Sequence, residues 1–207
     1  MYVSVIYHCF FPLFLTGITV KTENLIIAGT ISAVRALIIG RFQPFHLGHV
    51  HLAEHAQEYE LIFAIGSAYQ SLSFENPFTA GERYEMIDRA LGELDVKKYF
   101  IVPVPDIRRH GVYGKHVADL TPSFDVVISN NAVVKEIFER DGYEVKGAPL
   151  FHREKYQGKV IRKRMAEGKE WENLVPESVA SFIRDIGGEI RVRNLSSVPF
   201  GVGTFGL

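Results

Sequence analysis

The sequence predicts an α/β protein with a Rossmann-like, doubly wound parallel sheet of about five strands, helices on both faces, and further C-terminal helices. Two observations lead to this fold class. Short apolar segments alternate with helical patterns along residues 35–145. Clusters of polar residues follow the ends of these segments, which is the edge of a parallel sheet where ligands bind.

Each expected strand is a short apolar segment bounded by turn residues. The second is apolar without alternation, as in strands whose two faces are both covered. We expect strands at residues 35–40, 61–66, 99–104, 124–129 and 143–145.

Local signals set the boundaries of the helices, which we expect at residues 48–59, 79–91, 116–120, 132–140, 158–166 and 176–186. Thr79 and Glu82 form a capping box at the start of the second helix. Pro122 ends the third, Asp141-Gly142 closes the fourth, and Pro176 opens the last.

The composition is that of an ordinary globular chain, with 207 residues, 47% hydrophobic and 23% charged. This length favours one domain. The net charge of -1 gives no reason to expect a nucleic-acid partner or an anionic membrane surface, so any phosphate site is a local feature. The one cysteine, Cys9, excludes an internal disulfide and suits a reducing compartment, so we expect a cytoplasmic protein.

The most informative stretch covers residues 36–49, where an apolar segment breaks at Gly40 and a helix opens near Gly48. A strand, a tight loop and a helix N-terminus form an anion site, because the first turn of a helix has free N–H groups and a positive dipole end. His46 and His49 can lie on one face of that helix, and the glycine between them lets a ligand come close. The loop matches neither the P-loop nor the dinucleotide fingerprint.

This stretch, Gly-Arg-Phe-Gln-Pro-Phe-His-x-Gly-His at residues 40–49, resembles the His-x-Gly-His signature of the nucleotidylyltransferases, and in full length the archaeal-type nicotinamide mononucleotide (NMN) adenylyltransferases. The resemblance covers about residues 34–195. It implies an enzyme that transfers the adenylyl group of ATP to NMN, giving NAD and pyrophosphate. It also implies Mg²⁺ held by the phosphates and not by protein ligands, and a homo-oligomer, often a hexamer in this family.

Adenylyl transfer needs cations and N–H donors that hold two anions together, more than it needs covalent help from the protein. Carried over through the resemblance, the catalytic residues are His46, His49, Arg41 and Arg162. The residues assigned in the same way to ATP are Gly40, Phe42, Gln43, Gly48, Gly158 and Lys159.

A second basic segment, residues 158–165, opens a helix with a glycine and carries four cations between Lys159 and Arg164. Its composition alone indicates a solvent-exposed basic face of a helix. The family has a Ser-x-Thr-x-x-Arg motif here, and Arg162 falls on its arginine. Gln157 and Lys159 depart from the serine and the threonine, so Lys159 would supply charge where the family supplies a hydroxyl.

The resemblance assigns the NMN site to Ser67, Ile107, His110, Tyr113 and Asn131. His110 and Tyr113 stand where the family pattern Asp-Ile-x-x-Asn-x-x-Trp has Asn and Trp. Tyr113 can stack on a pyridinium ring and His110 can hydrogen-bond a carboxamide. The sequence gives no way to choose between NMN and nicotinic acid mononucleotide, since both fit the same pocket.

Two alternatives stay open at this point. One keeps the chemistry and changes the acceptor to FMN, pantetheine phosphate or, with CTP, a phospho-alcohol. Residues 41–45 disfavour it, because those branches usually follow the glycine with Thr-Phe-Asp. The other is a nucleotide-binding regulator that has lost catalysis, which Lys159 favours and the intact histidines disfavour.

We expect residues 1–33 to lie outside the working domain, which would span residues 34–195, and residues 196–207 to form a flexible tail. Family members start near Val34, and valine is what a GTG start codon encodes when read as internal. We therefore expect that residues 1–33 are absent from the native protein. A membrane anchor is the alternative, since residues 1–20 carry no Asp, Glu, Lys or Arg, although Pro12 and Gly17 interrupt them.

Overall fold

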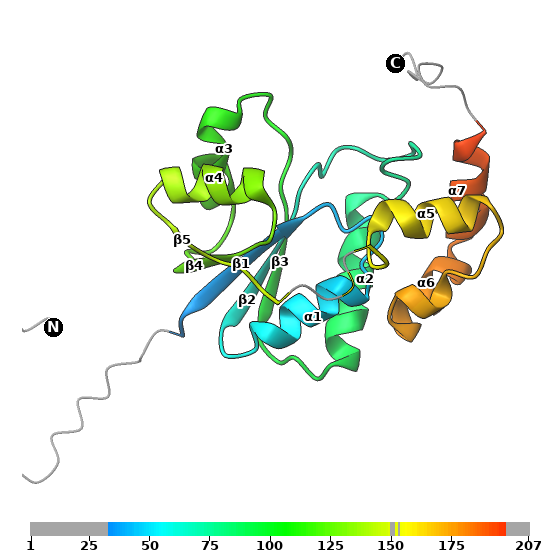
Figure 1. The fold of residues 1–207 in the computed structure, drawn as a ribbon, viewed down its shortest axis with the longest axis horizontal. Helices are drawn as coiled ribbons and strands as arrows, with labels where there is room; N and C mark the ends of the chain where they lie inside the picture. The colour runs from blue at the N-terminus through cyan, green and yellow to red at the C-terminus, as the bar shows by residue number, and fades with distance from the viewer. Residues whose placement is uncertain (1–32, 150–151, 153, 198–207) are drawn as a thin grey trace, which may run out of the picture. The chain divides into compact units, whose positions relative to one another are not determined.

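The computed structural model describes residues 33–149, 152 and 154–197 (Figure 1). The strands are β1 (Arg35–Gly40), β2 (Glu60–Ile65), β3 (Tyr99–Pro103), β4 (Val126–Ile128) and β5 (Glu144–Lys146). The helices are α1 (Leu47–His55), α2 (Ala80–Glu93), α3 (Tyr113–Leu120), α4 (Ala132–Arg140), α5 (Gly158–Ala166), α6 (Glu177–Asp185) and α7 (Gly188–Ser196). Two short 3-10 turns are η1 (His110–Val112) and η2 (Glu172–Leu174).

The strands form one sheet in the order β3-β2-β1-β4-β5, and every neighbouring pair is parallel. The chain runs from β1 outward through β2 to β3, then returns to the other side of β1 as β4 and β5. The predicted doubly wound parallel sheet is thus confirmed. The chain adds β2 and β3 on one side of β1, and β4 and β5 on the other. The point beside β1 where the strand order changes sides is where ligands bind in these sheets.

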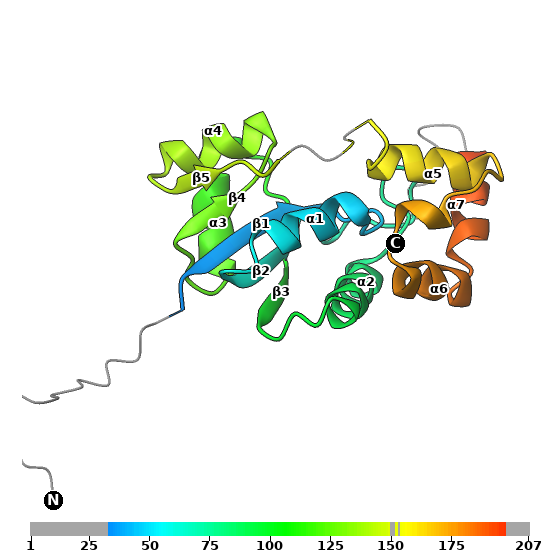
Figure 2. The ribbon, with the colours of Figure 1, turned by 60° about the horizontal axis from the view of Figure 1, so that its bottom comes forward.

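Alternate residues of β1 face two separate cores. Ala36 and Ile38 pack in the larger core with α1 and α2, while Leu37 packs in the smaller core with α3 and α4. Because a strand points successive side chains to opposite faces, a segment buried on both sides is apolar throughout. Figure 2 shows the helices on the two sides of the sheet.

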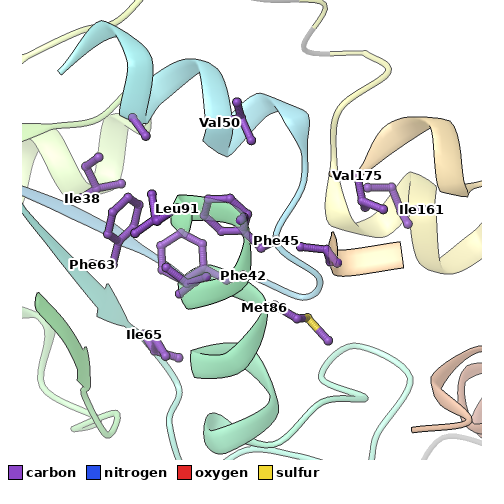
Figure 3. Close-up of a cluster of buried hydrophobic side chains, with 14 of the residues drawn as sticks. Ile38, Phe42, Phe45, Val50, Phe63, Ile65, Met86, Leu91, Ile161 and Val175 are labelled. Carbon is purple, nitrogen blue, oxygen red and sulfur yellow. The ribbon is translucent and has the colours of Figure 1, made fainter. Parts of the chain in front are cut away.

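The larger core reaches the loop after β1 (Figure 3). Phe42 and Phe45 lie with their ring centroids 5.8 Å apart, and each lies 6.0 Å from the Phe63 ring of β2. Phe42 takes a left-handed backbone conformation, with φ 51°, that costs about 1–3 kcal/mol in a non-glycine residue. Burial of its ring, about 1.5–3 kcal/mol for a large apolar side chain, offsets that strain and fixes the loop.

The C-terminal helices differ from the sequence prediction, which ended the helices at α6. The helix α7 follows it after Gly187, which has φ 64°. Its apolar signal is weak because Gly188 and Val192 are its only buried residues, and glycine has no side chain. The expected tail was therefore set too early, since Ser196 still belongs to α7; residues 198–207 lie outside the described part of the chain.

Smaller differences concern helix ends. The helix α1 stops at His55, four residues before the expected end, and α3 begins at Tyr113, directly after η1, three residues before the expected start. Residues 1–32 of the expected extension lie outside the described residues. No helix within residues 33–149 or 154–197 has both the length and the apolar character that crossing a membrane requires.

Candidate active site

Two histidines meet at the start of α1. His46 is its N-cap residue and His49 lies one turn later, and the two imidazole rings stack with centroids 3.6 Å apart and planes 19° apart. The Phe42 ring packs edge-on against His49, with centroids 4.8 Å apart. The sequence expectation that both histidines share one face is therefore confirmed, and the aromatic core fixes their position.

Hydrogen bonding sets the tautomer of His49. Its Nδ1 accepts a 3.2 Å hydrogen bond from the backbone N–H of His46, so the ring proton belongs on Nε2. Burial, and then the nearby His46, hold the pKa of His49 well below its usual 6.5, and burial lowers the pKa of His46 to about 3. Both rings are thus neutral at pH 7, and the Nε2–H of His49 is a neutral donor.

Gly48 lies between the two histidines, where a side chain would be crowded. A Cβ atom there would lie 3.1 Å from the His46 ring and 3.1 Å from Cβ of Tyr156. The glycine therefore lets Tyr156, in the segment before α5, approach the start of α1. The sequence predicts such a close approach at this position.

Arginines form the cationic part of the site. Arg41 follows β1 and is exposed, whereas Arg162 in α5 is only 5% exposed and lies with its guanidinium 6.0 Å above the Phe74 ring. Burial, and then the charge of Arg41, lower the pKa of Arg162 to about 10. Arg162 Nε finds no hydrogen-bond partner among the described residues. A buried cation with an unused donor is the expected partner of an anion.

The Gln43 backbone joins the loop after β1 to α5. Nη1 of Arg162 donates a 2.6 Å hydrogen bond to the carbonyl oxygen of Gln43. A Cβ at Gly158 would lie 2.6 Å from that oxygen, so only glycine permits the approach. The side chain of Gln43 is buried and exchanges hydrogen bonds of 2.8 and 3.0 Å with the backbone of Phe78. Gln43 thus holds two loops together through its side chain and its carbonyl group.

Arg83 supports the site from below and is not among the site residues that the sequence predicts. It is 0% exposed, and its donors go to the carbonyl oxygens of residues 41, 66, 67, 68 and 79 at 2.8–3.2 Å, which uses all five N–H groups of an arginine. Burial, and then Arg41, lower its pKa to about 10. Arg83 therefore fixes the loops after β1 and β2 in place. The sequence shows it only as the residue after the Thr79–Glu82 capping box.

A small cavity of about 210 Å³ opens beside the histidines. It is lined by His46, Gly48, His49, Asn131 and Tyr156, with further residues of β1, α1 and the segment after β4. This cavity lies at the carboxyl ends of β1 and β4, the two neighbouring strands between which the strand order changes sides.

A second cavity, of about 600 Å³, lies over the ends of β2 and β3 and the start of α4. It is called the large cavity below. Among its lining residues are Ile107, His110, Tyr113 and Asn131, four of the five residues expected at the NMN site. Burial, and then Asp106, raise the pKa of Tyr113 to about 12, so its phenol stays protonated. Asn131 lines both cavities and caps α4, because its Oδ1 accepts from the backbone N–H of residues 133 and 134.

Other expected site residues lie at the margins. Ser67 is buried, does not line the large cavity, and donates its backbone N–H to Asp106 Oδ1 at 3.3 Å. Phe42 is buried behind His49. Lys159 is exposed in the first turn of α5, and Gly40 ends β1.

In the described part of the chain, His, Cys, Asp and Glu side chains do not gather in threes or more where a metal ion would need them. The N–H groups of His49 and of the buried Arg162 are donors that suit an anion.

A family model and curated relatives place the chain in the same protein family. A model described as cytidylyltransferase-like matches residues 37–164. The nicotinamide-nucleotide adenylyltransferase of Archaeoglobus fulgidus is 45% identical over 174 residues, which is 81% of this chain and 100% of that protein. The protein of the same name from Methanosarcina acetivorans is 47% identical over 168 residues, 79% of this chain and 95% of that protein.

Solved structures share the fold at low sequence identity. A bifunctional NMN adenylyltransferase/ADP ribose pyrophosphatase from Francisella tularensis aligns with a TM-score of 0.59 and 19% identity, covering 81% of this chain and 58% of that one. The same protein complexed with AMP and a manganese ion gives a TM-score of 0.57. A putative nicotinate-nucleotide adenylyltransferase from Vibrio parahaemolyticus gives 0.54 at 14% identity, over 73% of this chain and 99% of that one. This chain spans a little over half of the Francisella protein.

Proposed function

The chain belongs to the cytidylyltransferase-like family and to its nicotinamide-nucleotide adenylyltransferases, and we propose that it transfers the adenylyl group of ATP to NMN, giving NAD and pyrophosphate. One observation carries the proposal. The stacked histidines at the small cavity adjoin a larger cavity with an aromatic wall, and Asn131 lines both. A nucleotide and an acceptor held in these cavities would meet at that boundary.

In the proposed reaction a phosphate oxygen of NMN attacks the α-phosphorus of ATP. A new P–O bond forms, the bond between the α-phosphorus and the bridging oxygen breaks, and pyrophosphate leaves with the electron pair. The task of the protein is to hold both anions in line and to stabilise the charge that grows on the phosphate oxygens. No covalent intermediate with the protein is needed.

His49 is the donor that best fits this task. Its Nε2–H is neutral and fixed in tautomer by the His46 backbone, and its ring is held in place by the edge-on contact with Phe42. A neutral donor that is already oriented stabilises developing charge without reorganisation of the site. We assign Arg162 to the phosphates for a related reason, since its buried Nε still has a donor to give. Arg41 and the first turn of α5 would extend this clamp toward the leaving pyrophosphate.

Mg²⁺ is part of the proposal as the ion that accompanies ATP. It would neutralise charge on the phosphate oxygens, which makes the α-phosphorus more open to attack. The Francisella relative crystallised with AMP and manganese supports the use of a divalent ion in this fold.

The large cavity is the proposed acceptor site. Tyr113 offers a neutral aromatic face to a pyridinium ring, and His110 and Ile107 line the same cavity. Asp106 adds a negative charge on the rim that favours the cationic ring. A cytoplasmic location belongs to the proposal because a single cysteine suits a reducing compartment. A homo-oligomer, a hexamer in many relatives, belongs to it through the family resemblance alone.

An acceptor panel tests the proposed function. The purified chain, with ATP and Mg²⁺, is given NMN, nicotinic acid mononucleotide, FMN or pantetheine phosphate in turn, and the products are identified by mass. We expect a dinucleotide from NMN at a kcat/KM far above that of FMN or pantetheine phosphate, and little turnover when CTP replaces ATP. Preferred use of FMN, pantetheine phosphate or CTP would contradict the assignment. Binding of ATP without any product would instead indicate a regulator.

A further inference from the structure

Side-chain hydrogen bonds run in series from Arg41 to Asp106. Arg41 Nη1 donates to Asn76 Oδ1 at 3.4 Å, Asn76 Nδ2 donates to Gln70 Oε1 at 3.1 Å, and Gln70 Nε2 donates to Asp106 Oδ2 at 3.0 Å. We call these four residues the polar relay. Its last member is itself anchored, because Asp106 Oδ1 accepts the backbone N–H of Ser67 at 3.3 Å.

The ends of the polar relay determine its direction. An arginine can only donate hydrogen bonds and an ionised carboxylate can only accept them. Between such ends, the amides of Asn76 and Gln70 satisfy both neighbours in one orientation alone. Turning either amide over would bring two donors or two acceptors face to face, so each amide is held by the other.

The two ends lie in different parts of the site. Arg41 lies near enough to Arg162 for its charge to lower the pKa of that arginine. Gln70 and Asp106 line the large cavity. Asn76, between them, is 5% exposed, and its backbone exchanges hydrogen bonds of 3.1 and 3.3 Å with the residue three positions earlier. The turn at Asn76 thus joins Arg41, which lies near Arg162, to the carboxylate at the large cavity.

We propose that Asn76 and Gln70 are positioning residues that couple occupancy of the large cavity to the placement of Arg41. The inference rests on the proposed function in taking NMN as the occupant. A ligand in the large cavity excludes water from the exposed Gln70–Asp106 hydrogen bond, and a hydrogen bond shielded from water is stronger and polarises its neighbours. Arg41 is then held more firmly, so ATP binds more tightly when NMN is present. Linkage requires the same factor in the reverse order of binding.

Exchanging one carboxylate and one amide tests the polar relay. In Asn76→Asp, Gln70 faces two acceptors and has one donor group for them. In Asp106→Asn, the new amide group cannot accept from Ser67 and also fit the amides before it. In the double variant the carboxylate has moved to position 76 and Gln70 turns over, so the two hydrogen bonds of Gln70 reverse, while Arg41 still donates to position 76 and the Ser67 N–H still donates to position 106. Net charge is also restored.

The readout is the affinity for α,β-methylene-ATP, an analogue that cannot undergo adenylyl transfer, measured by calorimetry with Mg²⁺ in the absence and presence of NMN. We expect each single variant to weaken analogue binding and the double variant to recover it, with the double differing from the product of the single effects by about tenfold. We also expect NMN to tighten analogue binding in the wild type and the double variant, and to do so less in the single variants.

A purely electrostatic role predicts a different pattern. Removing a carboxylate in Asp106→Asn would then tighten binding of the anionic analogue, Asn76→Asp would weaken it, and the double variant would equal the product of the two. That additive result would overturn the proposal. The matched control is Asn173→Asp, an exposed position whose Nδ2 bonds Glu170, for which we expect unchanged analogue affinity.

Two further measurements keep the test independent of the proposed function. Thermal melting of all four proteins needs no ligand, and the polar relay predicts that the double variant recovers the melting temperature that the single variants lose. Single variants that melt with the wild type, together with additive affinities, would refute the polar relay. If NMN gives no heat with any variant, the acceptor assignment fails, while the analogue affinities and melting temperatures still decide the role of Asn76 and Gln70.

Discussion

The carbonyl oxygen of Gln43 accepts a 2.6 Å hydrogen bond from Arg162, a residue 119 positions later in the chain. This contact joins the loop after β1 to α5, and so holds the two histidines and Arg162 in one site. A hydrogen bond to a charged group contributes about 1.5–3 kcal/mol. The geometry of the site therefore depends on a contact between the two ends of the domain.

Gly158→Ala is expected to disturb this contact. The added Cβ would lie 2.6 Å from the Gln43 carbonyl oxygen, too close for any real pair of atoms, so α5 must move away from the loop. We expect kcat/KM to fall by about tenfold or more, because displacing a catalytic group by a fraction of an ångström costs this much or more. Steady-state kinetics measure the effect.

The matched control is Gly92→Ala in α2, where an added Cβ meets nothing within 4 Å. This change is expected to leave kcat/KM unaltered and to raise stability by about 0.5–1 kcal/mol, as alanine does in a helix interior. Equal kinetics for the two alanine variants would show that the approach of Gly158 to Gln43 has no part in the site.

Arg162→Lys is expected to lower kcat on the order of 10²-fold with little loss of folded protein, because an ammonium cannot grip two phosphate oxygens as a planar guanidinium does. Arg164→Lys, two positions on, should stay within about twofold of the wild type, since Arg164 bonds the carbonyl of Glu170 at the surface. Pre-steady-state kinetics of NAD formation compare the two. Equal losses would mean that α5 presents only a diffuse basic face.

Arg83→Met is expected to lower the free energy of unfolding by about 3 kcal/mol or more. The guanidinium supplies donors to five carbonyl groups, three of them in buried hydrogen bonds, and each buried carbonyl left without a partner costs about 1–3 kcal/mol before the structure relaxes. Urea denaturation measures the loss. The control Arg89→Met lies on the same helix in an exposed pair with Glu85, and should change stability by less than about 1 kcal/mol. Similar losses would contradict a structural role for Arg83.

Stability should fall with acid through the two histidines. Their pKa values are lowered in the folded protein, that of His46 to about 3, so below pH 6.5 the unfolded chain binds protons that the folded protein does not. Stability from this source is therefore complete above pH 6.5 and is lost as the pH falls toward 3. Each histidine contributes a slope of at most about 1.4 kcal/mol per pH unit.

Denaturation at pH 7 and pH 5 measures this slope in the wild type and in a His46→Gln, His49→Gln double variant. The carboxylates titrate in both proteins and cancel in the difference. We expect the wild type to lose more stability than the variant between the two pH values. An identical loss would show that the histidines titrate normally.

Much of the fold could be predicted from the sequence because its signals are local. The apolar segments, the capping box at Thr79 and the closing glycine after α4 need only neighbouring residues to be read. The helix α7 could not be predicted, because its place depends on packing. A Cβ at Gly188 would lie 2.9 Å from the Phe78 ring, a contact over 110 positions that leaves no periodic pattern.

The site shows the same division. A compact motif marked His46 and His49, and the structure brings them together. The role of Arg83 could not be predicted, since its partners are backbone carbonyl groups, which every residue has. Gln43 was assigned to ATP from its place in the motif, and the structure shows that both groups of its side chain bond Phe78. The sequence identifies which side chains can form hydrogen bonds, but it does not show which backbone groups they contact in the folded protein.

The fate of the α-phosphorus tests the central claim most directly. The purified chain is incubated with NMN, Mg²⁺ and ATP labelled at the α-phosphorus, in parallel with ATP labelled at the γ-phosphorus, and a His49→Ala variant is run beside it. We predict α-label in NAD and γ-label in pyrophosphate, with kcat in the variant lower by about 10²–10³ and its KM for ATP little changed. Label that stays in ATP or appears in ADP, or a variant with unchanged kcat, would contradict the account.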